Sequence, residues 1–112
     1  MIVKDKAISI TEPVSGEGIN KVKMAVLIGE NEGAPNFYMR KFELEAGGHT
    51  PYHTHDWEHV VYILEGSGVL KGKDGGRRLE AGSAVLVAPN EEHQFRADDG
   101  TPLSFLCSIP KP

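Results

Sequence analysis

The chain has 112 residues, of which 39% are hydrophobic and 25% are charged, the balance of an ordinary globular protein. This length suits one hydrophobic core, so we expect a single domain over residues 1–112. The formal net charge of -4 gives no electrostatic reason to expect nucleic acid or an anionic membrane as a partner. No apolar run is long enough to span a membrane, and the N-terminus lacks the apolar centre of a secretory signal. Because Cys107 is the only cysteine, no internal disulfide can form. We therefore expect a cytoplasmic protein whose partner is a small molecule or another protein.

The N-terminal residues 1–30 carry the weakest pattern. Lysines and apolar residues alternate between Lys21 and Val26, which predicts a strand. The opening segment MIVKDKAISI could pair with the main sheet or with a neighbouring subunit. We therefore expect the N-terminal strands at a sheet edge or at a dimer interface.

A clearer strand is predicted from Phe37 to Glu45, where apolar and charged positions alternate as in a half-buried strand. Arg40 is the exception, because it lies on the apolar phase. The next run, Val60 to Leu64, is apolar on both phases, which predicts that both of its faces are covered. We expect the core on one face and another sheet or a second subunit on the other, and a second subunit would make the protein a homodimer.

Short predicted strands separated by turns complete the chain. The GSG sequence at 66–68 predicts a turn, residues 69–71 a short strand, KDGG a hairpin turn, and residues 77–79 the returning strand. Residues 81–95 predict an apolar strand closed by a Pro-Asn turn, and PLSFLCSIP predicts a last strand. With glycine-rich turns throughout and no long helical pattern, the fold class is all-β, either a sandwich or a small barrel.

Histidine is concentrated in one short stretch. Four of the five histidines lie between His49 and His59, and the fifth is His93. Because residues two apart in a strand project from the same face, we expect His53 and His55 to form a chelating pair. We expect His59 to open the next strand, His93 to return from a separate hairpin, and His49 to lie at the rim or on the surface. A single histidine is more often a surface or core residue than a ligand. Four together would suit manganese, iron, nickel, copper or zinc.

The spacing of these residues resembles the two motifs of the cupin superfamily. The first motif, a glycine, a histidine pair, a third ligand and a closing glycine, falls at Gly48, His53, His55, His59 and Gly66. The second, a glycine, a proline and a histidine, falls at Gly82, Pro89 and His93. The resemblance covers about Phe37 to Ile109 and implies a double-stranded β-helix, the cupin jelly-roll barrel, with its core at about 37–109. It also implies that His53, His55, His59 and His93 bind a metal.

One departure concerns the third ligand, because most cupins have glutamate where this chain has His59. Four neutral histidines leave the full charge of a divalent metal in place, which favours an anionic ligand. With the run HTHDWEHVVYILEG, this all-histidine set resembles small single-domain manganese cupins. The resemblance implies one divalent transition metal per chain, manganese before iron, nickel, copper or zinc. It also implies a homodimer and dioxygenase-type chemistry.

We expect a small-molecule pocket beside the metal. Its predicted lining is Arg40, Phe42, Trp57, Ile63, Phe95, Phe105, Cys107 and Ile109. Arg40 is either an anchor for a substrate carboxylate or a structural arginine paired with an acidic residue. Cys107 is a soft pocket wall, an oxidation-sensitive thiol or a buried small hydrophobe. The catalytic residues are not fixed by the sequence, and the candidates are Arg40, Cys107 and Tyr52.

Three functions are consistent with these features. The first is a metal-dependent oxidoreductase, a dioxygenase that oxidises or cleaves a small organic substrate. The second is a metal-dependent isomerase or lyase, which needs a general base, with Tyr38, Tyr52 or Tyr62 as candidates. The third is a non-catalytic module that binds a small molecule, anionic molecules included, since a fold alone does not establish catalysis.

Overall fold

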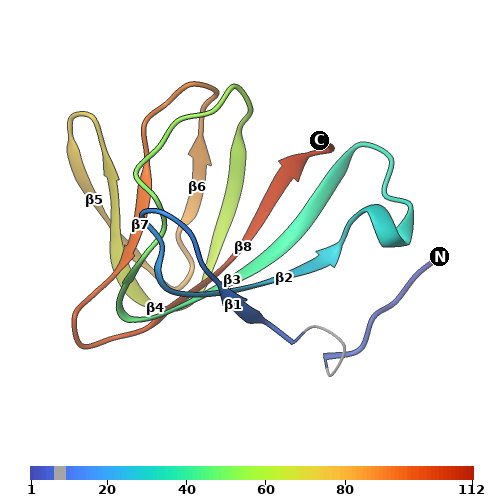
Figure 1. Ribbon diagram of the computed structural model, residues 1–112, viewed down its shortest axis with the longest axis horizontal. Coiled ribbons are helices and arrows are strands. Elements are labelled where there is room, and N and C mark those ends of the chain that lie inside the picture. Colours follow the sequence, from blue (N-terminus) through green and yellow to red (C-terminus); the bar gives the residue numbers. More distant parts are fainter. Residues whose placement is uncertain (7–9) are drawn as a thin grey trace.

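The computed structural model describes residues 1–6 and 10–112, and this part of the chain is built from β-strands (Figure 1). The strands are β1 (Glu12–Val14), β2 (Asn20–Ile28), β3 (Phe37–His49), β4 (His59–Gly72), β5 (Gly75–Glu80), β6 (Ala84–Val87), β7 (Gln94–Ala97) and β8 (Leu103–Pro110). A single 3-10 turn, η2 (Glu30–Glu32), lies between β2 and β3. Within the described ranges, no helix has the length and apolarity needed to cross a membrane.

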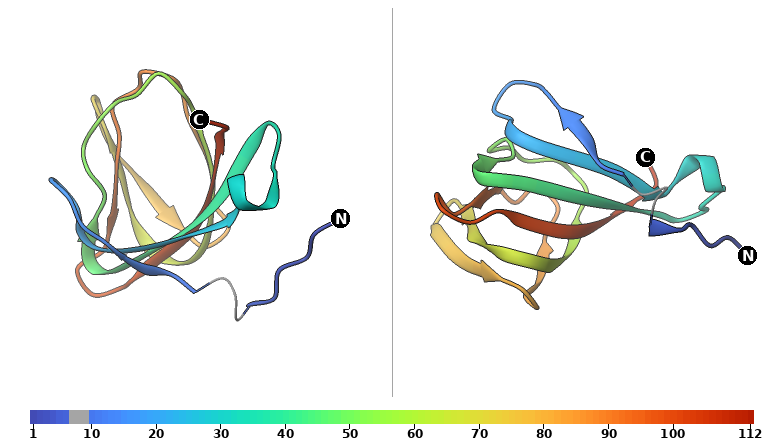
Figure 2. Two further views of the ribbon diagram at one scale, coloured as in Figure 1. Left: turned by 45° about the vertical axis from the view of Figure 1, so that its right-hand side comes forward. Right: turned by 90° about the horizontal axis from the view of Figure 1, so that it is seen from below.

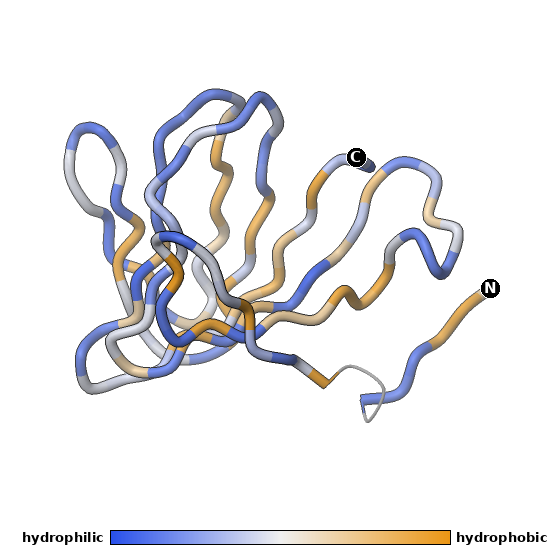
Figure 3. The backbone as a smooth tube through the Cα atoms, viewed as in Figure 1, coloured by the Kyte–Doolittle hydropathy of each residue, from blue (hydrophilic) through white to orange (hydrophobic). Residues whose placement is uncertain are grey.

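The sheet closes into a barrel through β3 and β4. Each of these two strands pairs antiparallel with both β7 and β8, so the four strands form a closed ring (Figures 1 and 2). Strands β5 and β6 add to β4, which β5 pairs near its C-terminal end and β6 near its start. The all-β barrel predicted from the turn pattern is therefore confirmed. In Figure 3 the apolar residues follow the strands and the hydrophilic residues gather in the loops.

The core lies inside this ring and comes mainly from alternate residues of β4, β7 and β8. Its most deeply buried large side chains are Phe105, Leu44, Ile63, Leu103 and Val61, each at most 1% exposed. The strict alternation of buried and half-buried residues along β8 shows that one face of that strand meets the core. The inward phase predicted for Phe37–Glu45 holds, because Leu44 is buried in the core.

Strand β4 is longer than expected, because the predicted turn at 66–68 is wrong. The strand continues through these residues with a register shift between Ile63 and Glu65. Gly66 has φ +85°, and a Cβ there would collide with the carbonyl oxygen of Pro102. A Cβ on Gly68 would collide with the carbonyl oxygen of Arg96. These glycines let β4 bend and pass close to its neighbours, so they mark a bulge rather than a turn.

The N-terminal strands extend the sheet beyond β3. Strand β2 pairs with β3 along its length, and β1 pairs with β2 at the edge of the sheet. Val22 of β2 is only 4% exposed and belongs to the core. This segment therefore contributes to the inside of the barrel as well as to its edge.

An outer face of the barrel carries exposed apolar side chains. Val60 lies beside Leu86 of β6, and Tyr62 lies beside Ala84 of β6 and Leu106 of β8. Val60, Tyr62 and Leu86 are 55%, 49% and 67% exposed. The sequence predicted that another sheet or a second subunit covers this face of residues 60–64. The described part of the chain places no second sheet over it.

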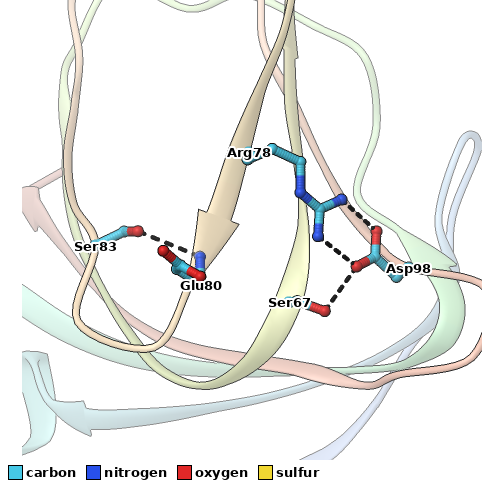
Figure 4. A network of polar contacts seen from close by, with 5 residues as sticks. All are labelled: Ser67, Arg78, Glu80, Ser83 and Asp98. Atoms are coloured by element: carbon cyan, nitrogen blue, oxygen red, sulfur yellow. Dashed lines mark hydrogen bonds and ion pairs between the residues drawn. The ribbon is translucent and has the colours of Figure 1, made fainter.

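At the other end of β4, an ion pair joins three segments (Figure 4). The Arg78 guanidinium donates from both terminal nitrogens to the Asp98 carboxylate, at 2.8 and 2.7 Å. The Ser67 hydroxyl donates to the same carboxylate at 2.6 Å. These bonds lower the pKa of Asp98 to about 2, with Arg78 as the larger cause and Ser67 the second. The network ties β5, β4 and the end of β7 together.

Candidate metal centre

Four histidines converge at one end of the barrel, where two loops meet. His53 and His55 lie in the loop between β3 and β4, His59 is the first residue of β4, and His93 immediately precedes β7. His53 and His93 exchange backbone hydrogen bonds at 3.0 and 3.1 Å, which joins the two loops. The expectation that His53 and His55 share a strand face is wrong, because residues 54–58 belong to no strand and the chain bends at 56–57.

The side-chain nitrogens of these four residues lie close enough to bind one ion. One potential ligand atom from each ring lies within 4.8 Å of the others. Nε2 of His55 and Nε2 of His59 are 2.8 Å apart. Burial increases from His53, which is exposed, through His55 to His59 and His93, which are 7% and 3% exposed. The site is therefore open to solvent on the His53 side and closed behind His59 and His93.

Hydrogen bonds at Nδ1 fix the orientation and the tautomer of two of these rings. Nδ1 of His55 lies 2.7 Å from the Trp57 carbonyl oxygen, and Nδ1 of His93 lies 2.8 Å from the Glu91 carbonyl oxygen. Because a carbonyl oxygen only accepts, each Nδ1 carries the proton, and in a neutral ring Nε2 keeps a free lone pair. Nε2 of His93 is buried and has no hydrogen-bond partner in the described chain.

These features fit a bound metal ion. A buried acceptor such as Nε2 of His93 destabilises the fold if it has no partner. A cation bound between the converging lone pairs would be that partner. Imidazole nitrogen is a common ligand of divalent transition metals, and the partners of Nδ1 are of the kind that orient metal-binding histidines. The residues present therefore fit the metal that the sequence pattern implies. Imidazole is a borderline ligand that binds manganese, iron, nickel, copper and zinc, so the ligand type alone does not identify the metal.

His59 is backed by a sulfur atom and a guanidinium rather than by a carbonyl. Its Nδ1 lies 2.9 Å from Sγ of Cys107 and 3.5 Å from Nη2 of Arg40. Nη2 of Arg40 also donates to Sγ of Cys107, at 3.3 Å. With Nε2 aimed at the other histidines, the Nδ1 hydrogen of His59 points to the sulfur. Burial raises the pKa of the Cys107 thiol, and Arg40 opposes that shift.

The surroundings keep the histidine rings neutral. Burial first, and then the nearby Arg40 charge, lower the pKa of His59 to about 3. Burial is also the main cause that lowers the pKa of His53 and of His93, although the Glu91 carbonyl opposes the shift at His93. Neutral imidazole is the form that binds metal, so these rings are ready to bind at neutral pH.

Aromatic rings support the cluster. The Trp57 ring stacks on His55 with centroids 3.7 Å apart and an interplanar angle of 8°. Phe95 approaches His93 with centroids 6.4 Å apart. Phe105 stacks on both Phe42 and Phe95, at 5.2 and 4.7 Å. This wall of nearly parallel rings continues from the histidines into the barrel.

A cavity of about 230 Å³ lies beside the histidines. It is lined by Val14, Ile19, Val22, Met24, Arg40, Phe42, Thr50, Pro51, His53, Trp57, His59, His93, Phe95, Phe105 and Cys107. Six of the eight expected lining residues are among them. Ile63 and Ile109 are not, because both are packed in the core below the cavity.

The sequence missed the contribution of the N-terminal hairpin to this cavity. Val14, Ile19, Val22 and Met24 come from β1, β2 and the turn between them. The alternation around Val22 and Met24 predicted a strand, but nothing in it showed that its apolar side would cover the barrel opening. The hairpin forms one wall, so it limits what can bind.

The remaining candidates lie away from the histidine cluster. The Tyr52 hydroxyl donates to Glu92 at 2.9 Å on the surface, and this bond is the main cause that raises the pKa of Tyr52. Tyr62 is on the outer face and Tyr38 packs against the core, so no tyrosine lines the cavity. Nδ1 of His49 approaches Thr50 and Gln94, and His49 is not part of the cluster.

Comparison with known proteins agrees with this geometry. The cupin domain model matches residues 40–109. A curated relative, 1-methylthio-D-xylulose 5-phosphate methylsulfurylase from Rhodospirillum rubrum, is 32% identical over 71 residues, which are 63% of this chain and 46% of that protein. The chain thus spans less than half the length of this relative.

Solved structures extend the comparison to the whole chain. The polyketide cyclase RemF from Streptomyces resistomycificus is 31% identical, with a TM-score of 0.93 over 100% of this chain and 80% of that one. A predicted oxalate decarboxylase from Thermotoga maritima is 24% identical, with a TM-score of 0.84 over 99% of this chain and 100% of that one, a likeness of fold alone. Because the domain model matches well over half of the residues and the barrel carries the histidine cluster in its expected place, the chain belongs to the cupin family.

Proposed function

We propose that this protein is a metal-dependent enzyme that oxidises a small organic substrate in dioxygenase fashion. The observation that carries the proposal is the convergence of four histidines at the end of an apolar cavity, with the buried Nε2 of His93 lacking a hydrogen-bond partner among the described residues. We propose manganese as the metal, because the all-histidine set resembles that of manganese cupins. When bound, a manganese or iron ion would supply the redox chemistry with dioxygen.

The chain's own residues hold the metal and prepare the cavity. His53, His55, His59 and His93 would provide imidazole nitrogen ligands, and the carbonyls of Trp57 and Glu91 orient two of the rings. Phe42, Phe95 and Phe105 exclude water and position a flat apolar substrate beside the histidines. At about 230 Å³ the cavity is below the usual range for drug-sized ligands, so a single-ring molecule suits it.

The cavity lining favours oxidation over chemistry that needs a protein base. No aspartate, glutamate or tyrosine is among its described lining residues. Burial raises the pKa of the Cys107 thiol, which therefore does not act as a ready base. Dioxygenase chemistry needs no such base for its first step. An isomerase or lyase would have to use a group other than the tyrosines considered from the sequence.

A metal-assisted cyclisation is the second candidate, favoured by one observation. The polyketide cyclase RemF matches this chain over its whole length at 31% identity. Cyclisation of a poly-β-ketone requires a carbonyl to be polarised and the chain to be held folded, and the aromatic wall of this cavity could hold a planar product. A module that only binds a small molecule is the alternative to both.

Turnover with different metals separates these functions. The protein would be loaded with manganese, iron or zinc and supplied with styrenes, β-diketones and a short poly-β-ketone, with oxygen consumption and products recorded. The proposal predicts oxygen uptake with manganese or iron and none with zinc, and none for His59→Ala. Anaerobic product formation with zinc would favour the cyclase, and no turnover under any condition would favour the binding module. Glu58→Ala, which changes a neighbour outside the cluster, is the matched control.

A further inference from the structure

One charged side chain in the cavity, that of Arg40, has only part of its hydrogen bonding satisfied. Its Nη2 donates to Sγ of Cys107 at 3.3 Å. Its Nε is buried and has no partner among the described residues. A guanidinium carries five N–H donors, so most of them are unmatched. The ion pairs found in residues 1–6 and 10–112 are Lys4–Glu32, Lys41–Glu43 and Arg78–Asp98, and none of them includes Arg40.

The surroundings of Arg40 do not supply the missing counter-charge. Its Cζ lies 5.0 Å from the ring centroid of Phe42 and 6.0 Å from that of Trp57, so the cation sits between aromatic rings. Such contacts stabilise a cation only modestly, and this half-buried guanidinium, whose Nε is shielded from solvent, has no anionic partner in the part of the chain that the structure describes. The other ionisable lining groups are the three neutral histidines and Cys107. The structural alternative from the sequence, an arginine paired with an acidic residue, is not observed in the described chain.

We propose that Arg40 binds the carboxylate of the substrate, and that the substrate is a small aromatic carboxylic acid. This inference rests on the proposed function only in placing the substrate in this cavity. The planar fork of an arginine matches a carboxylate with two parallel hydrogen bonds. The wall formed by Phe42, Phe105 and Phe95 matches an aromatic ring beside that carboxylate.

The same lining argues for a carboxylate rather than a phosphate. No lysine and no second arginine is among the described residues that line the cavity, so beside the proposed metal site Arg40 is the one cationic side chain of that lining. A phosphate group carries more charge and more acceptor oxygens than one guanidinium can satisfy. A monoanionic carboxylate is balanced by it.

Binding of matched probes tests this assignment without turnover. Phenylacetate and its neutral analogue phenylacetamide would be titrated into the zinc-loaded protein and into the EDTA-treated protein. Trp57 is the only tryptophan and lines the cavity, so its fluorescence reports occupancy. We expect the wild-type protein to bind phenylacetate at least about tenfold more tightly than phenylacetamide, the scale of one or two charge-assisted hydrogen bonds. Arg40→Gln should abolish this preference, and Arg40→Lys should keep part of it.

The control variant is Arg96→Gln, which removes a half-buried arginine of β7 that does not line the cavity and should leave the preference unchanged. Should Arg40→Gln fail to fold, the Nε–H signal of Arg40 in the NMR spectrum of the wild-type protein still tests whether Arg40 contacts the carboxylate. It should shift with phenylacetate and not with phenylacetamide.

An equal affinity of the wild-type protein for both probes would overturn the proposal, and so would a preference for phenylacetate that survives in Arg40→Gln. A preference that is present only with zinc and does not depend on Arg40 would also overturn it, because the carboxylate would then bind the metal. An Arg40-dependent preference in a protein that turns over no substrate would contradict the proposed enzyme and leave this inference standing.

Discussion

The close passage of β4 across its neighbours makes Gly66 the residue whose replacement is expected to cost most among the glycines with positive φ. An alanine there must adopt φ near +85°, which costs about 1–2 kcal/mol, and its Cβ would also collide with the carbonyl oxygen of Pro102. That oxygen belongs to the backbone leading into β8, so relief requires a shift of the strand. Adding about 1–3 kcal/mol for overpacking gives a total of about 2–5 kcal/mol for Gly66→Ala.

Gly82 provides the matched control. It has φ +94°, and a Cβ there would meet nothing within 4 Å, so Gly82→Ala should cost only the strain of about 1–2 kcal/mol. Gly68→Ala provides the opposite comparison, because it adds a collision with the Arg96 carbonyl oxygen without a positive φ. Urea unfolding followed by tryptophan fluorescence would measure the free energy of unfolding of all three variants. A cost for Gly66→Ala no larger than that for Gly82→Ala would refute the reasoning about the crossing.

Three further predictions concern charge and assembly. In the metal-free protein the buried histidines stay neutral while the unfolded chain takes up protons, so stability should fall as the pH drops below about 6.5. The free energy of unfolding should fall by about 1.4 kcal/mol per pH unit for each such ring, and for His59 this fall should end at its folded pKa of about 3. Urea unfolding at several pH values should show a shallower pH dependence for His59→Gln than for the wild type. An equal pH dependence would contradict the burial argument. Asp98, whose pKa is lowered to about 2, stabilises the fold fully above its ordinary pKa, and this contribution should disappear as the pH falls through about 2. Asp98→Asn should therefore lose stability at neutral pH but show a weaker acid dependence than the wild type, and an unchanged dependence would contradict the role of the Arg78 pair. We also propose that the exposed face around Val60, Tyr62 and Leu86 joins two copies in a homodimer. Light scattering should then find a dimer that Leu86→Asp converts to a monomer, with Glu80→Gln as control, and a monomeric wild type would refute the contact.

The sequence predicted the histidine cluster correctly but for an incomplete reason. The two-residue strand period was invoked for His53 and His55, whereas both lie in a loop, a bend at 56–57 separates them from His59, and the backbone bridge from His53 to His93 joins the two loops. The four residue types and their order were sufficient, because the β3–β4 loop and the segment before β7 meet at the same end of this barrel whatever their local conformation. The alternation in β3 likewise placed Arg40 and Phe42 on the inner face, where both line the cavity.

Other features depend on contacts between distant segments, which a local pattern does not report. Gly66 and Gly68 resemble turn residues in sequence, and only the nearness of Pro102 and Arg96 shows that they serve a strand crossing. Ile63 shares a strand phase with His59, yet it lies far enough along β4 to be packed in the core. The N-terminal hairpin covers the cavity because of how β2 pairs with β3, a pairing that no short motif specifies.

The central claim is that His53, His55, His59 and His93 bind one divalent metal ion. Metal analysis of protein purified without chelators, and of protein dialysed against manganese, measures it directly. We predict about one metal ion per chain in the wild type and in the control His49→Ala, and a loss of most of it in His59→Ala and His93→Ala. A wild-type protein that takes up no divalent metal, or a His93→Ala variant that keeps a full complement, would contradict the claim.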